Sequence, residues 1–227
     1  MNKKVIIIAE AGVNHNGNLD NAKKLILAAA NAGADYVKFQ TFKADKLVSK
    51  DAQKAEYQKV NTGKEDESML EMVKKFELDK EFHIELINHC AKCNIKFLSS
   101  PFDIESVELL VDLELDLIKI PSGEITNKPL LRKVAQAGLP IIISTGMATH
   151  DEVASALEVL IEESVSKSEI VVLHCTTNYP APLSEVNLKA MVQMGIDFGL
   201  RVGYSDHTEG IGVASTAVAL GAVIIEK

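Results

Sequence analysis

The chain has 227 residues, of which 47% are hydrophobic and 25% are charged, a composition typical of a globular protein. Its formal net charge of −8, with no dense cluster of Lys and Arg along the sequence, argues against a nucleic-acid surface. No apolar run approaches the roughly 20 residues that a membrane-spanning helix needs, and three cysteines cannot all pair. We therefore expect a cytoplasmic protein that binds neither nucleic acid nor a membrane.

Short apolar runs alternate with amphipathic helical patterns along the whole chain. The first run ends at the charged Glu10, too early for the apolar core of a signal peptide, so we expect it to be a strand. The predicted strands are Val5–Ala9, Tyr36–Gln40, Ile95–Ser99, Leu117–Ile120, Pro140–Ser144, Ile170–His174, Leu200–Tyr204 and Ala222–Glu226. Eight strands that alternate with helices predict an α/β protein with a (β/α)8 TIM barrel. The alternative is an open doubly wound sheet, but no glycine-rich nucleotide fingerprint follows the first strand.

Residues that favour helix ends fall between these runs. The predicted helix starts are Asn18, Asn127 before Lys128-Pro129, and Thr149 with Glu152 in a capping box. The predicted stops are Gly33, Gly138 and Gly221.

Two features depart from the repeat. Residues 42–67 form a long lysine-rich polar insertion after the second strand, which predicts either a lid over an anionic ligand or a solvated excursion. The chain stops at Lys227, at the edge of the eighth strand, and no eighth helix follows. We therefore expect one catalytic barrel domain over residues 1–227, truncated at strand eight, with apolar surface exposed along one seam.

Two lysines, Lys38 and Lys119, stand inside apolar strand runs at equivalent positions. Because side chains alternate along a strand, each lysine faces away from its apolar neighbours, which in a barrel means toward the interior. A buried ammonium is costly unless an anion meets it. The pair predicts two cations at the mouth of a barrel that binds a negatively charged substrate. The alternative is a pair of internal salt bridges with Glu10 or Glu124.

Polar residues cluster where the other predicted strands end. These segments are Glu10–Gly17, Ser99–Asp103, Lys119–Glu124, Ser144–Met147, His174–Pro180 and Tyr204–His207. Active sites in this fold lie at that face and draw residues from several strands. Lysines, serines and glycine-adjacent amides suit a phosphate, whereas histidines and carboxylates suit a divalent metal or proton transfer. Their shared position favours an enzyme.

Several of these segments resemble the sialic acid synthase family over nearly the whole chain. They are Ala9–Gly17, Val37–Gln40, Lys119–Glu124, Ser144–Met147, His174–Thr177 and Gly203–Thr208. The family condenses phosphoenolpyruvate with an N-acetylated mannose-type sugar, giving a nonulosonic acid and phosphate. The resemblance is stronger to its legionaminic acid synthase branch, which uses a 2,4-diacetamido-2,4,6-trideoxymannose, than to the enzymes that use N-acetylmannosamine. Thr177, where the latter have asparagine, favours the diacetamido sugar.

The resemblance also implies roles for individual residues. Those matching the phosphoenolpyruvate pocket are Lys38, Gln40, Ser100, Lys119, Ser122, Ser144, Tyr179 and Ser205. Glu10 and Glu124 match catalytic carboxylates that face the sugar and the reacting water, and Glu10 is the candidate to handle the proton of that water. His207 matches one of two histidines that hold a divalent metal, manganese first, with magnesium or cobalt as alternatives.

Two family features lie beyond the printed chain. The second metal-binding histidine follows the Glu-Lys pair that ends strand eight, and this chain stops at Lys227. The family also has a C-terminal antifreeze-like domain that reaches over the partner's active site in a homodimer. The resemblance therefore implies an incomplete metal site and makes the activity of the chain as printed doubtful.

Two competing functions remain open: a Schiff-base aldolase that uses Lys38 or Lys119 as nucleophile, and an inactive ligand-binding fragment. For other residues we expect structural roles. His15 is interpreted as a loop residue and His174 as a hydrogen-bonded core residue, and Asp206 is expected to orient His207. The residues expected on helix surfaces are His83, His89 and His150, and those expected to be reduced thiols are Cys90 and Cys93.

Overall fold

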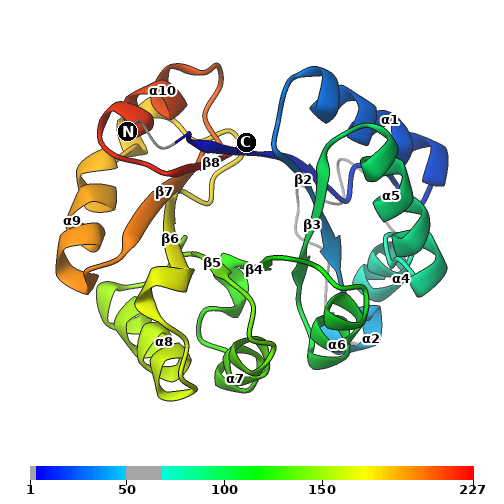
Figure 1. The fold of residues 1–227 in the computed structure, drawn as a ribbon, viewed down its shortest axis with the longest axis horizontal. Coiled ribbons are helices and arrows are strands. Elements are labelled where there is room, and N and C mark those ends of the chain that lie inside the picture. The colour runs from blue at the N-terminus through cyan, green and yellow to red at the C-terminus, as the bar shows by residue number, and fades with distance from the viewer. Residues whose placement is uncertain (1–3, 50–67) are drawn as a thin grey trace.

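The protein is a ring of parallel strands surrounded by helices, seen along the ring's axis in Figure 1. A computed structural model describes residues 4–49 and 68–227. Its strands are β1 (Ile6–Gly12), β2 (Tyr36–Thr41), β3 (Lys96–Pro101), β4 (Ile118–Ile120), β5 (Ile141–Ser144), β6 (Ile170–Cys175), β7 (Arg201–Ser205) and β8 (Ile224–Glu226). All eight predicted strands are confirmed, with ends that differ by three residues or fewer.

The strands are hydrogen-bonded in the order β3-β2-β1-β8-β7-β6-β5-β4, and every recorded pair is parallel. The two ends of this order, β3 and β4, lie side by side, so the sheet curls into a nearly closed barrel (Figure 1). The (β/α)8 prediction is confirmed, and the open doubly wound sheet is excluded. Pairing of β1 with β8 brings the two ends of the chain together, with the backbone N–H of Glu10 donating to the carbonyl of Lys227 at 2.8 Å.

The helices are α1 (Leu19–Asn31), α2 (Ala44–Leu47), α4 (Met69–Lys74), α5 (Lys80–Lys92), α6 (Ile104–Asp112), α7 (Lys128–Gln136), α8 (His150–Glu162), α9 (Leu188–Phe198) and α10 (Gly212–Ala219). Three predicted caps are present. The side chains of Asn18 and Asn127 each accept a backbone N–H in the first turn, and Thr149 forms a capping box with Glu152. Within the described residues, no helix is both long and apolar enough to cross a membrane.

Side chains alternate between the two faces of the barrel wall. Outward-facing residues pack against the helices, while an inner layer fills the lower barrel with Ile8, Leu98, Ile142, Val171, Leu173 and Ile224. Gly203 lies within this layer, where an added Cβ would sit 2.5 Å from Leu173 Cδ2. The packed apolar layer closes the barrel from below, so in the described part of the chain the barrel is open to a ligand at the carboxyl ends of its strands.

A second, small apolar cluster covers one side of the barrel mouth. It joins Phe42 and Ala44, beside β2, to Met72 and Val73 of α4. Most of the predicted insertion, residues 50–67, lies outside the described residues, so both interpretations of it stay predictions. The cluster nevertheless shows that the segments flanking the insertion are anchored against the barrel.

The predicted seam lies between α10 and α1, where β8 and β1 run side by side (Figure 1). Ile7 on β1 is 38% exposed, and Leu220, directly after α10, is 45% exposed. Apolar surface is therefore exposed at these elements, as expected.

Candidate active site at the barrel mouth

A cavity of about 680 Å³ opens at the carboxyl ends of the strands. Its lining includes all but one of the predicted site residues: Glu10, Lys38, Gln40, Ser100, Lys119, Ser122, Ser144, Thr177, Tyr179, Ser205 and His207. The exception is Glu124, which ends the 3-10 turn Ser122–Glu124 and accepts a hydrogen bond from Asn127 Nδ2 at 2.7 Å. The structure therefore brings together most of a set scattered over the chain, but does not place Glu124 in the cavity wall.

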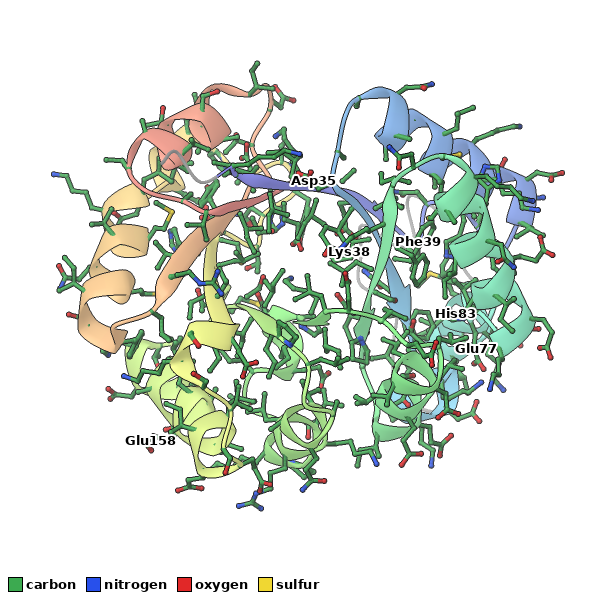
Figure 2. All side chains as sticks on the ribbon, in the orientation of Figure 1. Asp35, Lys38, Phe39, Glu77, His83 and Glu158 are labelled. Carbon is green, nitrogen blue, oxygen red and sulfur yellow. The ribbon has the colours of Figure 1, made fainter. Side chains whose placement is uncertain are left out.

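Both strand lysines lie inside the barrel. Lys38 is 5% exposed and Lys119 is 2% exposed, and both line the cavity. Figure 2 shows Lys38 directed toward the centre of the barrel and its neighbour Phe39 on the helix side, as period-two alternation requires. The inward position predicted for Lys38 is confirmed.

A buried carboxylate on β8 meets both lysines. Glu226 lies 3.2 Å from Lys119 Nζ and 3.8 Å from Lys38 Nζ, and its Oε1 accepts a hydrogen bond from Ser205 Oγ at 2.8 Å. Lys38 also forms an ion pair with Glu10. Internal salt bridges are therefore present, but their partners are Glu10 and Glu226 rather than Glu124.

Glu226 was missed by the sequence analysis. Its signal resembles that of the lysines, because it is a charged residue two positions after the inward-facing Ile224 in an apolar run. The pattern alone did not show whether Glu226 lies within the barrel or at the end of the strand.

The four charges perturb one another. Burial alone would raise the pKa of Glu226, but Lys119, Lys38 and the Ser205 hydroxyl lower that pKa to about 2. Burial alone would lower the pKa of Lys38, but the carboxylates of Glu226 and Glu10 raise it above its ordinary value. Burial, assisted by the nearby Lys38, lowers the pKa of Lys119. Burial also raises the pKa of Glu10 against the attraction of Lys38.

Hydroxyl groups surround the charged floor of the cavity, which Lys38, Lys119 and Glu226 form. The Oγ atoms of Ser100 and Ser144 are buried and have no hydrogen-bond partner among the described residues. Ser122 Oγ accepts the backbone N–H of Gly146 at 2.9 Å and lies 3.4 Å from Cys175 Sγ. Free hydroxyl donors beside two ammonium groups form a suitable environment for an anionic oxygen.

His207 is held with one ring nitrogen turned toward the cavity residues. Its Nδ1 donates to the Thr176 carbonyl at 2.5 Å, so in the neutral ring Nε2, 3.2 Å from Ser205 Oγ, carries the lone pair. Tyr179 stacks on the imidazole with ring centroids 4.1 Å apart. The predicted orienting role of Asp206 is wrong, because its carboxylate binds Thr208 and Lys227 instead.

Three other histidines lie away from the cavity. His15 is buried between aromatic rings, and its Nδ1 accepts the Gly17 N–H at 2.9 Å, which agrees with a structural role. His83 is buried rather than at the surface, because Thr41 Oγ1 and the Asp79 carbonyl satisfy its two ring nitrogens. His174 Nε2, expected to be hydrogen-bonded, has no partner in the described part of the chain.

The NeuB family model matches residues 25–227. The chain belongs to the NeuB family. This NeuB chain is 59% identical over 225 residues to the N,N'-diacetyllegionaminic acid synthase of Campylobacter jejuni subsp. jejuni, covering 99% of the chain and 67% of the relative. It is 51% identical over 224 residues to the synthase of the same name from Legionella pneumophila, covering 97% of the chain and 62% of the relative.

A solved structure shares the architecture of the NeuB chain. The crystal structure of the N-acetylneuraminic acid synthetase from Leptospira borgpetersenii, in complex with citrate, aligns with a TM-score of 0.86 and 34% identity. The alignment covers 100% of the NeuB chain and 73% of that protein. The family resemblance seen in the sequence is thereby confirmed.

Proposed function

We propose that this NeuB chain carries the site at which phosphoenolpyruvate condenses with an acetamido sugar to give a nonulosonic acid. The observation that carries the proposal is the pair Lys38 and Lys119, buried at the cavity floor beside the unpartnered hydroxyls of Ser100 and Ser144. A phosphate and a carboxylate on one small molecule supply the negative oxygens that this arrangement can bind. The sequence relatives named above are transferases of this class, which supports the assignment.

For the acceptor we propose 2,4-diacetamido-2,4,6-trideoxymannose, with N-acetylmannosamine as the alternative. The two relatives with 59% and 51% identity are N,N'-diacetyllegionaminic acid synthases, which favours the diacetamido sugar. Thr177 lies in the cavity wall, where a residue that distinguishes sugars would be expected.

The proposed reaction makes a C–C bond to the sugar and a C–O bond to water, and it breaks the C2–O bond to phosphate. C3 of phosphoenolpyruvate attacks the aldehyde carbon of the open-chain sugar, whose oxygen takes up a proton. Water adds to the resulting cation at C2 and loses a proton, and the tetrahedral intermediate then expels phosphate as its C2–O bond breaks. The products are the 2-keto acid and inorganic phosphate.

The residues of the cavity suit the charges in this sequence. Lys38 and Lys119 would balance the phosphate and the carboxylate, and Ser100, Ser144 and Ser122 would donate hydrogen bonds to their oxygens. Gln40, Ser205 and Tyr179 complete the wall of the same cavity.

Glu10 is the candidate base for the water that attacks C2. Burial raises its pKa against the attraction of Lys38, and a carboxylate with a raised pKa is a stronger base. Glu226, with a pKa of about 2, stays ionised and holds the lysines in place. The catalytic role of Glu124 stays a prediction from the resemblance.

A divalent cation, manganese before magnesium or cobalt, is part of the proposal through His207. The imidazole fits as one ligand, because its Nδ1 donates to the Thr176 carbonyl and the lone pair is left on Nε2, whose neighbour Ser205 Oγ donates to Glu226. Within residues 4–49 and 68–227, no three His, Cys, Asp or Glu side chains converge as a metal site would require. One ligand does not make a site, so we derive no step through the metal. The homodimer also stays a prediction.

A Schiff-base aldolase is the second candidate, favoured by the lowered pKa of Lys119, which would make its amine more nucleophilic. Borohydride added with pyruvate would trap a covalent adduct on Lys119, detectable as a mass increase of the peptide that contains it. Condensation with phosphoenolpyruvate forms no such adduct.

Calorimetric titration of phosphoenolpyruvate, with and without Mn²⁺, tests the proposed function. We expect saturable binding that weakens at least about tenfold in Lys119→Met, because one of the two buried cations is lost. Lys96→Met is the matched control, since Lys96 begins β3 and pairs with Asp116 at an exposed site. Unchanged binding in Lys119→Met would contradict the proposed anion site. Binding without phosphate release would identify the inactive ligand-binding fragment, and an absence of binding by the folded chain would contradict both that alternative and the proposed anion site.

A further inference from the structure

Met147 adopts a backbone conformation that is unusual for a residue with a side chain. Its φ is +63°, in the left-handed region that favours glycine. The residues around it leave little freedom, because the Gly146 N–H donates to Ser122 Oγ and the Ala148 N–H donates to the Thr145 carbonyl at 3.2 Å. Thr149 then caps α8. The turn thus holds a methionine where glycine would cost less, which suggests that the side chain itself is used.

The side chain of Met147 stands at the rim of the active site. It is 78% exposed, and it lines the 680 Å³ cavity. It also lines a second cavity of about 310 Å³ between α8 and α9, whose walls include Ala148, Val153, His174 and Met194. Met147 therefore lies at the boundary between the substrate cavity and a partly apolar space behind it.

The chemistry of the rim differs from that of the floor. The floor carries Lys38, Lys119 and Glu226, whereas Val13, Phe102 and Met147 contribute apolar surface to the same cavity. An acetamido group presents a methyl that is best placed against apolar atoms. A thioether side chain is flexible and polarizable, so it can pack against such a methyl without a fixed geometry.

We propose that Met147 is a specificity-determining residue that packs against the acyl methyl of the acceptor's acetamido group. The α8/α9 cavity is the space into which its side chain moves when a longer acyl chain is bound. This inference rests on the proposed function, because it takes an acetamido sugar as the acceptor. Met147 then selects the acyl group, which accounts for the strained backbone conformation at this residue.

The kinetic test uses Met147→Gly and Met147→Ala with 2,4-diacetamido-2,4,6-trideoxymannose and its 2,4-dipropanamido analogue as acceptors, measured by phosphate release. Met147→Gly removes the side chain and relieves the positive φ, so we expect an unchanged or higher Tm. We expect kcat/KM for the diacetamido sugar to fall about fourfold or more, the value of one buried methyl group. The preference should shift toward the dipropanamido sugar, while the KM for phosphoenolpyruvate stays unchanged.

Ile211→Ala is the matched control, because Ile211 is 74% exposed at the start of α10 but does not line the cavity. This variant should retain the acyl preference of the unmodified chain. A preference in Met147→Gly equal to that of the unmodified chain would overturn the inference.

A second readout separates this inference from the proposed function. In protein labelled with ¹³C at the methionine methyl groups, the Met147 signal is assigned by its loss in Met147→Gly. With phosphoenolpyruvate present, we expect 2,4-diacetamido-2,4,6-trideoxymannose to move that signal and mannose to leave it in place. Phosphate release with an unmoved signal overturns the role of Met147 alone. A moved signal without phosphate release overturns the reaction but supports the contact, and failure of both overturns both.

Discussion

The carboxylate of Glu226 lies between two buried lysines, 3.2 Å from Lys119 Nζ and 3.8 Å from Lys38 Nζ. The three residues belong to β8, β4 and β2, so only closure of the barrel brings them together. Two ammonium groups in a low-dielectric interior would repel one another and lose their hydration. Glu226 offsets both costs and stays ionised, which makes it the centre of the charged floor.

Glu226→Gln should destabilise the protein by about 3–5 kcal/mol, the usual cost of leaving a buried charge without its partner. Inorganic phosphate should raise the Tm of the variant more than that of the unmodified chain, because a bound anion would replace the missing charge. Thermal unfolding with and without phosphate measures both effects. Glu158→Gln on the outer surface of α8 is the control and should change neither (Figure 2). If phosphate raised the Tm of Glu226→Gln by no more than it raises that of the unmodified chain, the role given to this carboxylate would be contradicted.

Glu10→Gln should lower kcat about 100-fold or more while weakening phosphoenolpyruvate binding much less, because it removes a general base but keeps the side-chain size. Burial raises the pKa of Glu10, so the acid limb of kcat against pH should lie above the ordinary carboxyl pKa and should vanish in the variant. Steady-state phosphate release across pH provides the measurement. A variant that keeps the acid limb would assign the base to another residue.

Gly146→Ala should destabilise the turn after β5 and weaken anion binding. The new Cβ would lie 2.5 Å from Thr177 Cγ2, 2.9 Å from Cys175 Sγ and 3.0 Å from Ser122 Oγ. Such overpacking costs about 1–3 kcal/mol and would disturb the hydroxyl that accepts the Gly146 N–H. Gly212→Ala is the control, since nothing lies within 4 Å of its added Cβ and Gly212 does not line the cavity. Comparable losses in both variants, by denaturant unfolding and calorimetry, would show that close packing at Gly146 is not the cause.

Stability should fall as the pH drops below 6.5, because burial lowers the pKa of His15, His83 and His174. A folded pKa below the unfolded value means that the unfolded chain binds more protons, so the stabilisation is complete above pH 6.5 and is lost toward the folded pKa. Denaturant unfolding between pH 8 and 5 measures the slope.

His83→Gln should lower stability at pH 8 and reduce that slope. The raised pKa of Glu10 acts in the opposite direction, so the comparison with the variant isolates the contribution of His83. If stability changed with pH equally in His83→Gln and in the unmodified chain, the lowered pKa of His83 would not contribute to the pH dependence.

Local patterns predicted the fold because they depend on the backbone and on near neighbours. The caps at Asn18 and Thr149 need only the first turn of their own helices, and both are present. The inward direction of Lys38 follows from alternation along one strand. His83 shows the limit of such patterns, since its burial depends on Thr41 from β2, which is 42 residues away in sequence.

The sequence by itself determined the eight strands with helices between them, the family, and eleven of the residues that line the cavity. These follow from strand and helix periods and from motifs that are local in the chain. Only the tertiary structure decided which charges meet. Barrel closure pairs Lys119 with Glu226, 107 residues later. The physical reason is that pairing energies depend on distance and burial across strands, and neither can be derived from spacing along the chain.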